Sequence, residues 1–119
     1  MSESLYVRLG ESEGITRIAN DVVENHLANP AINARFKDSD PDKLKRGAAT
    51  FFITGTGGPA VYEGKDMLAT HKGMNISHAE FMAVLDDALD ALAKNDIPQR
   101  EQEEVLFVLY SMRTEILAV

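Results

Sequence analysis

The chain has 119 residues, 45% of them apolar, and a formal net charge of −7. This length favours a single domain, which we expect to span residues 1–119. Because nucleic acids and anionic membranes both recruit basic faces, the acidic balance argues against either as a partner. No apolar run approaches the roughly 20 residues that a membrane-spanning helix needs. Cysteine is absent, which excludes disulfides and thiolate sites and fits a cytoplasmic location.

Two helices are predicted in the first part of the chain. Residues 5–9 place apolar side chains at helical spacing, and Gly10 ends this short turn. We expect Ser12 to be the N-cap of the next helix. Apolar positions at i, i+3, i+4 and i+7 continue over residues 15–27, as in an amphipathic helix, until Pro30 stops it.

A short turn and a longer helix are predicted next. Residues 31–36 form the turn. Asp40 before Pro41 is typical of an N-cap followed by proline at the first helical position. We expect this helix to run over residues 41–54, and the glycine-rich residues 55–59 end it.

The second half of the chain contains two further helices. Ser77 and Glu80 form a capping box, and Ile76 and Phe81 are spaced as a hydrophobic staple. Residues 95–98 break this helix, and the last helix is apolar over more than half its girth, so we expect it to be buried. No strand is predicted. The fold class is therefore all-α, with four substantial helices and two short ones.

A long irregular link separates the two halves and contains His71, between Gly64 and Gly73. An irregular link of roughly 20 residues is unusual in so small a domain. The link is either disordered or held by something around which it wraps. His71 is correspondingly either an exposed loop residue or a single metal ligand.

The three histidines do not form a metal-hydrolase pattern. His26, His71 and His78 show no His-x-x-x-His pair, so a zinc site would require all three to converge. His26 lies on an apolar helix stripe and is interpreted as a core-edge histidine with a local hydrogen bond. His78 follows a helix cap and is expected to be exposed.

Two other site types find little support. The glycines at 55, 57 and 58 lack the preceding strand and the Gly-Lys-Ser/Thr sequence of a phosphate loop. No nucleophile-elbow motif is present. The acidic groups are interpreted as solvated helix faces: Asp86, Asp87, Asp90, Glu101, Glu103 and Glu104.

A cofactor held by one histidine is the remaining candidate. Haem needs one axial nitrogen and a flat apolar slot. Residues that could supply the walls, with ordinary core packing as the alternative for each, are Phe36, Leu44, Ala48, Phe51, Phe52, Met67, Leu68, Ile76, Phe81 and Val84.

The chain resembles the group I truncated haemoglobins, compact two-over-two helical globins. The matching residues are LeuAlaAsnPro at 27–30, Phe36, LeuLys at 44–45, PhePhe at 51–52, GlyGlyPro at 57–59, Tyr62, Gly64, Met67, HisLysGly at 71–73, IleSer at 76–77 and Phe81. The resemblance implies a two-over-two helical sandwich with an extended loop before a one-turn proximal helix. It also implies that His71 is the proximal ligand of haem iron (iron protoporphyrin IX), and that Phe36 stacks on the porphyrin.

The chain departs from this family on the distal side of the expected haem. Val23 stands where relatives place a tyrosine, and Ala48 where they often place glutamine. Leu44 takes the position of the distal histidine of larger globins, and Gly47 that of a second iron-ligating histidine in one relative. Together with Phe52, these residues make a distal pocket without a polar group. Outside the pocket, a double glycine of the family appears here as Gly10–Glu11.

Three functions follow as hypotheses. The first is a monomeric haem protein that binds oxygen, carbon monoxide or nitric oxide, for oxygen transport or gas handling. Without a distal donor it should release oxygen quickly, with a smaller effect on carbon monoxide and easier oxidation to ferric iron. The second is a nitric oxide dioxygenase or peroxidase-like enzyme with a reductase partner. The third is a non-haem helical interaction module. If haem binds, Lys43, Arg46 and Lys72 are candidate partners of its propionates.

Overall fold

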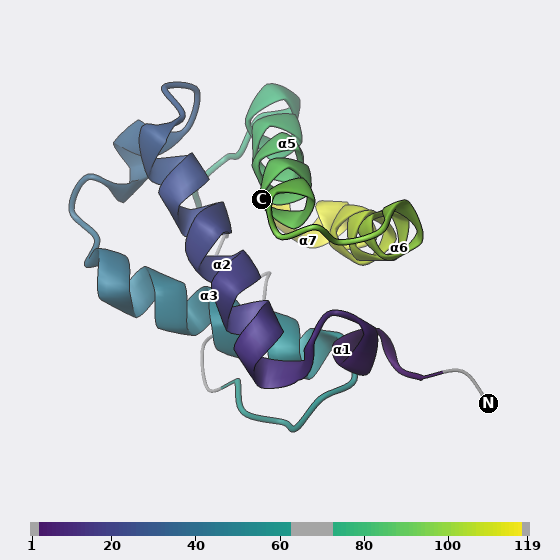
Figure 1. The fold of residues 1–119 in the computed structure, drawn as a ribbon. Helices are drawn as coiled ribbons and strands as arrows, with labels where there is room; N and C mark the ends of the chain where they lie inside the picture. Colours follow the sequence, from purple (N-terminus) through teal and green to yellow (C-terminus); the bar gives the residue numbers. More distant parts are fainter. Residues whose placement is uncertain (1–2, 63–72, 118–119) are drawn as a thin grey trace.

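The computed structural model describes residues 3–62 and 73–117. Within these ranges the chain is helical, with an isolated parallel bridge between Ile76 and Leu117 and no strand, which confirms the all-α class. None of the helices in the described ranges combines the length and apolar content that a bilayer span requires. The elements, labelled in Figure 1, are α1 (Leu5–Arg8), α2 (Glu11–Ala28), the 3-10 helix η1 (Asn33–Phe36), α3 (Pro41–Gly55), α5 (His78–Lys94), α6 (Gln99–Tyr110) and α7 (Arg113–Ile116).

Two helix starts follow the predicted caps. The Asp40 side chain accepts a hydrogen bond of 3.0 Å from the amide of Asp42, and Pro41 occupies the first helical position of α3. At the start of α5, Ser77 Oγ accepts from the Glu80 amide, and Glu80 Oε1 accepts from the Ser77 amide, each at 3.1 Å. Both donors would otherwise be unsatisfied at a helix N-terminus, so these side chains fix where α3 and α5 begin.

The predicted cap of α2 is wrong. Gly10, with φ of 98°, precedes the helix, and Glu11 already belongs to it with φ of 61°. Ser12 lies inside the first turn, where its Oγ forms a 2.8 Å hydrogen bond with the hydroxyl of Tyr6. The left-handed backbone at Gly10 turns the chain sharply, and the helix therefore begins earlier than a serine cap would place it.

Helix α2 is the centre of the packing. It contacts α1, η1, α3 and α5, while α5 in turn contacts α6, as the crossing of the helices in Figure 1 shows. The main apolar cluster joins these helices and consists of Leu9, Ile15, Ile18, Val22, Ile53, Ala88, Ala91, Leu92 and Val105. A second cluster of Ile76, Phe81 and Leu85 is packed against Leu106, Leu109, Ile116 and Leu117 near the C-terminus.

The last helix differs from its prediction. Residues 99–117 contain two helices, α6 and α7, because the chain turns after Tyr110. The Phe107 side chain is 75% exposed and Tyr110 is 42% exposed, so the expectation that this helix is buried all round is wrong. Among the described elements, α6 makes its main helix contacts with α5 and α1, and these leave Phe107 and Tyr110 exposed.

Candidate functional site

One side of α3 carries a half-buried apolar row. Leu44, Ala48 and Phe51 lie one turn apart along the helix and are each partly exposed. The neighbouring Ala49 and Ile53 are buried, and α3 makes extensive contact with α2. Within the described ranges, contacts of that extent are not found between α3 and either α5 or α6. The row therefore lies beside the α2 contact and not inside it.

The other expected pocket residues on α2 and α3 differ in environment. Val23 is buried, yet it belongs to neither of the two apolar clusters formed by described residues. Phe52 is packed against the main cluster, where it lines an internal void of about 10 Å³ together with Ile15 and Val22. Phe52, which is itself half-buried, thus packs against the edge of the main cluster.

Two expected haem contacts are core residues of the second cluster. Ile76 and Phe81 are buried there, as the hydrophobic staple predicts, and the Phe81 ring centroid lies 6.2 Å from that of Tyr110. Ordinary packing therefore accounts for both side chains. Met67, Leu68, His71 and Lys72 fall outside the described residues, as does the rest of the stretch 63–72.

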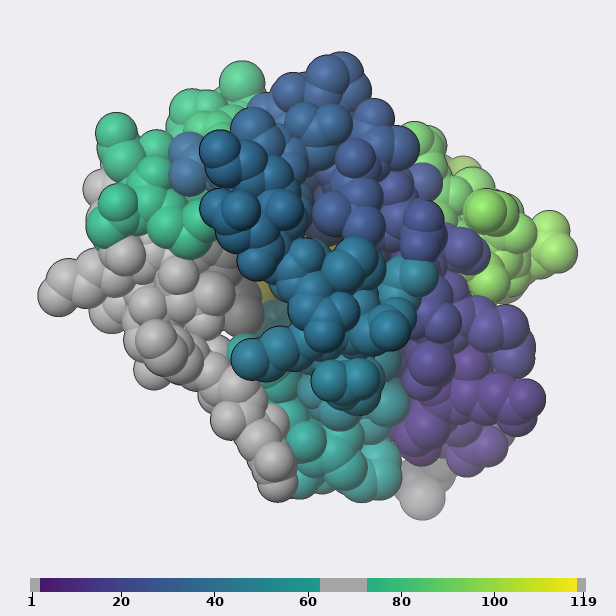
Figure 2. Space-filling model, turned by 90° about the vertical axis from the view of Figure 1, so that its left-hand side faces the viewer, coloured from purple at the N-terminus to yellow at the C-terminus, as the bar shows by residue number. Residues whose placement is uncertain are grey.

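A hollow opens in the surface near the start of α3. In the space-filling view of Figure 2 it borders the η1–α3 segment, and residues of the C-terminal part are visible at its base. The Phe51 ring faces Tyr62 edge-on, with 5.5 Å between centroids and 75° between planes. Half-buried aliphatic and aromatic side chains such as those of α3 suit a flat apolar cofactor, because such a group covers surface that water otherwise contacts.

A buried polar cluster joins the end of α2 to α5. His26 Nδ1 donates to Asp87 Oδ2 at 2.7 Å, and Asn29 Nδ2 donates to Asp87 Oδ1 at 3.1 Å. Asn25 Nδ2 donates to the Asp87 carbonyl at 3.0 Å. Asp87 is only 7% exposed, so its interpretation as a solvated residue is wrong. Its place at the edge of the apolar stripe, three residues after Val84, was the available signal.

His26 is at the edge of the core, as predicted, but its hydrogen bond is not local: the partner lies on another helix. Its imidazole also stacks on the ring of Phe36, with 5.9 Å between centroids and 8° between planes. His78 is exposed at the first position of α5, as expected.

An ion pair connects η1 to the start of α5. The Arg35 guanidinium contacts both carboxylate oxygens of Glu80, and its Nη1 donates to the Met74 carbonyl at 3.2 Å. Hydrogen bonds from Arg35 and from the Ser77 amide lower the pKa of the Glu80 carboxyl to about 2. This pair fixes Phe36, the residue after Arg35, relative to α5.

Residues 4–118 match the model of a family described as bacterial-like globin. The chain belongs to this family. Truncated globins bind haem and diatomic gases, and the half-buried apolar row of α3 suits such a group.

Named relatives support the resemblance to group I truncated haemoglobins. A group 1 truncated hemoglobin of Tetrahymena pyriformis is 25% identical over 115 residues, which cover 97% of this globin and 95% of that protein. Another from Chlamydomonas moewusii is 26% identical over 116 residues, which cover 96% of this globin and 68% of that protein.

Solved structures agree on the fold. The truncated hemoglobin of Tetrahymena pyriformis in its Fe(III) form superposes with a TM-score of 0.94 at 25% identity, covering 98% of this globin and all of that chain (100%). A 2/2 hemoglobin of Synechococcus, with covalently attached haem, gives 0.89 at 22% identity over 97% of this globin and 98% of that chain. The expected two-over-two fold is confirmed.

The basic side chains of α3 differ in whether they form an ion pair with another described residue. Lys45 pairs with Glu24 of α2. Lys43 and Arg46 are exposed and form no ion pair within the described part of the chain. These two remain available as propionate partners, whereas Lys45 is engaged.

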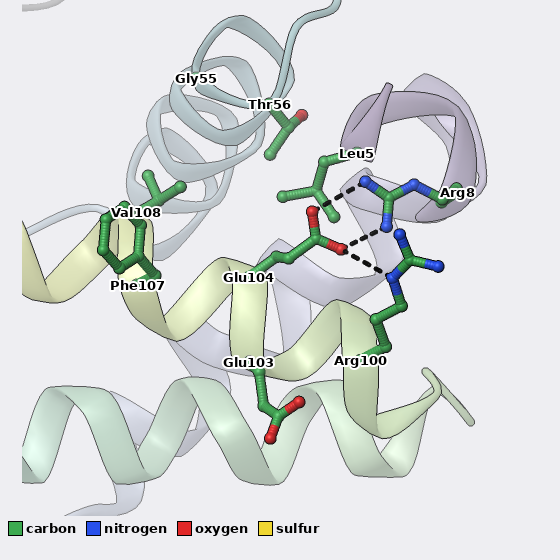
Figure 3. A pocket seen from close by; sticks show the side chains of 9 residues that line it. All are labelled: Leu5, Arg8, Gly55, Thr56, Arg100, Glu103, Glu104, Phe107 and Val108. Atoms are coloured by element: carbon green, nitrogen blue, oxygen red, sulfur yellow. Dashed lines mark hydrogen bonds and ion pairs between the residues drawn. The ribbon is translucent and has the colours of Figure 1, made fainter. Parts of the chain in front are cut away.

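A separate cleft of about 490 Å³ lies between α1, the end of α3 and α6 (Figure 3). Arg8 reaches across it to Glu104 and lies 3.2 Å from Glu101, and Arg100 lies beside the same carboxylate of Glu104. These contacts raise the pKa of Arg8 and lower that of Glu104. Glu101 is buried, so its interpretation as a solvated residue is wrong, whereas Glu104 pairs with Arg8 and its side chain is still 39% exposed. Glu103 is exposed, as expected.

Proposed function

We propose that this globin binds haem through His71 and reversibly holds oxygen, carbon monoxide or nitric oxide at the iron. The observation that carries the proposal is the half-buried apolar row of α3, in a chain that belongs to a haem-binding family. Haem supplies the iron to which a diatomic gas binds. His71 supplies the axial nitrogen, and Met67 and Leu68 are proposed to pack near it.

The side chains of the proposed distal pocket exclude water but cannot hydrogen-bond to a bound gas. Leu44, Ala48 and Phe52 of α3 and Val23 of α2 have no donor in their side chains. A donor beside a bound gas contributes about 1 kcal/mol, and more in a dry site. Its absence should speed release of oxygen roughly tenfold, because each 1.4 kcal/mol is about a factor of ten. Carbon monoxide, which is less polar when bound, should be affected less.

Phe36 is proposed to stack on the porphyrin plane, with Ile76 and Phe81 as more distant walls. Ile76 and Phe81 are buried in the second cluster, so we propose that they support the pocket. Their substitution would also affect folding. Lys43, Arg46 or Lys72 would pair with the propionates. We further propose that residues 1–119 form one domain that acts as a cytoplasmic monomer.

An enzymatic role, such as nitric oxide dioxygenation or peroxidase-like turnover, is the alternative. It requires an electron donor, and peroxide cleavage also requires an acid–base group at the distal side. The pocket side chains Val23, Leu44, Ala48 and Phe52 supply none. Gas binding is therefore favoured over catalysis.

The test is haem loading followed by gas binding. The purified protein, or the protein titrated with haemin, should develop a Soret band, and the ferrous form should bind carbon monoxide and oxygen reversibly. Failure to take up haemin would overturn the proposal. Sustained consumption of nitric oxide with a reductase at rates far above autoxidation would favour the enzymatic alternative.

A further inference from the structure

The buried Asp87 lacks a role in the function proposed above. A carboxylate loses hydration when it is buried, and this cost is offset only if its oxygens accept hydrogen bonds. Here the C-terminal part of α2 satisfies it, through His26 and Asn29. Buried polar groups of this kind are often no more stabilising than apolar ones of the same shape. Stability alone therefore does not account for this cluster.

The cluster fixes the orientation of the His26 ring. A carboxylate oxygen accepts, so Nδ1 of His26 carries the hydrogen that points to Asp87, 2.7 Å away. The His26 side chain is 14% exposed and that of Asp87 is 9% exposed, which leaves the imidazole little freedom to rotate. Asn29 holds the carboxylate from its other oxygen, so the acceptor is fixed as well.

The oriented ring of His26 stacks on the ring of Phe36. The two rings are almost parallel, at 8°, and their centroid separation of 5.9 Å is that of an offset stack. Within the described residues, His26 is the ring partner of Phe36. Phe36 ends a single-turn 3-10 helix without a side-chain cap, whose backbone the Arg35–Glu80 pair holds near α5, and the stack on His26 is a contact of the ring itself.

We propose that His26 and Asp87 are positioning residues that set the plane of the Phe36 ring and thereby the retention of haem. This inference rests on the proposed function, in which Phe36 stacks on the porphyrin. Asp87 orients His26, His26 orients Phe36, and Phe36 presents its face to the cofactor. None of the three touches the gas.

The test is a double-mutant cycle on the rate at which ferric haem transfers to excess apomyoglobin. In His26→Asn the amide nitrogen replaces Nδ1 and can still donate to Asp87, but the ring is lost. Haem loss should accelerate about 3- to 10-fold, the size of effect expected for one aromatic pair. In a Phe36→Leu background the same substitution should add less than about twofold, because His26 then has no ring to orient.

Asn25→Ala is the matched control, since it removes a hydrogen bond between the same two helices without touching the ring stack. It should lower the urea midpoint without accelerating haem loss. Apo-protein NMR gives a second readout, because Phe36→Leu should shift the His26 ring protons by removing the ring current.

Equal acceleration of haem loss by His26→Asn and Asn25→Ala, or additivity with Phe36→Leu, would overturn the positioning role while leaving haem binding intact. Absence of a Soret band from the wild-type protein would instead overturn the proposed function, and this proposal with it.

Discussion

Arg35 of η1 binds Glu80 of α5 through two nitrogens, although the residues are 45 positions apart in the chain. Glu80 simultaneously completes the capping box of α5 with Ser77. One carboxylate therefore fixes where α5 begins and how η1 lies against it, and its pKa falls to about 2 as a result.

The first prediction concerns acid stability. The pKa of Glu80 is lower in the folded chain than its ordinary 4.5, so its contribution is complete above about pH 4.5 and disappears as the pH falls towards 2. Glu80→Gln keeps a capping side chain but removes the charge. The variant should be less stable than wild type at pH 7, and the difference should shrink between pH 4.5 and 2.

Urea unfolding followed by far-ultraviolet circular dichroism across this pH range measures the effect. Glu103→Gln is the control, since Glu103 is exposed and has no ion-pair partner in the described part of the chain. A stability difference for Glu80→Gln that stays constant down to pH 3 would contradict the assignment.

The second prediction concerns the start of α2. Glu11 has a φ of 61°, a left-handed conformation that costs an L-residue roughly 1–2 kcal/mol. Glycine relieves this strain but loses more entropy on folding, so Glu11→Gly should stabilise by about 0.5–1 kcal/mol. Glu13→Gly, in the regular part of the same turn, should instead destabilise by about 0.5–1 kcal/mol. Urea midpoints that fall equally for both variants would argue against strain at Glu11.

The caps of α3 and α5 could be predicted from sequence because Asp40 and Ser77 act on amides two or three residues away. The hydrogen-bond partners of Asp87 could not, because Asn25 and His26 are more than sixty positions distant and only the packing of α2 on α5 brings them together. The exposure of the Phe107 side chain could not be predicted for the same reason. Its apolar character is local information, whereas its exposure depends on which helices cover α6.

For the site, the sequence identified the apolar side chains of α3 but not which of them face the core. Phe52 and Ala48 lie one turn apart on α3 and are both half-buried, yet only Phe52 is packed against the main cluster of described residues. The position of the neighbouring helices decides which half-buried side chains of a helix meet the core.

The third prediction concerns the turn after α3. A Cβ atom on Gly58 would lie 2.4 Å from the Tyr6 ring and 2.8 Å from the Ile53 carbonyl oxygen. Gly58→Ala must therefore displace the ring or the backbone and should destabilise by about 1–3 kcal/mol. Gly55→Ala is the control, because nothing lies within 4 Å of its Cβ position. It should be neutral or stabilise by about 0.5 kcal/mol. Thermal unfolding of both variants checks this, and equal losses would mean that the Tyr6 contact is unimportant.

The fourth prediction concerns gas release. Ala48→Gln introduces an amide donor at a half-buried position of α3. It should slow oxygen release about tenfold, the effect of one hydrogen bond, and change carbon monoxide release less. Ala48→Met has a similar shape without a donor and should not slow oxygen release. Stopped-flow displacement of oxygen by carbon monoxide measures both. If Met and Gln slow release equally, the effect is steric and the hydrogen-bond account fails.

The central claim is that His71 is the axial ligand of haem iron, and the absorption spectrum of the ferric and ferrous protein tests it most directly. Wild type and His78→Ala, which changes an exposed histidine of α5, should show the same Soret and visible bands after haemin loading. His71→Ala should lose haem affinity, show a weakened and shifted Soret band, and regain a wild-type-like ferrous spectrum when imidazole is added. A spectrum unchanged by His71→Ala would contradict the claim.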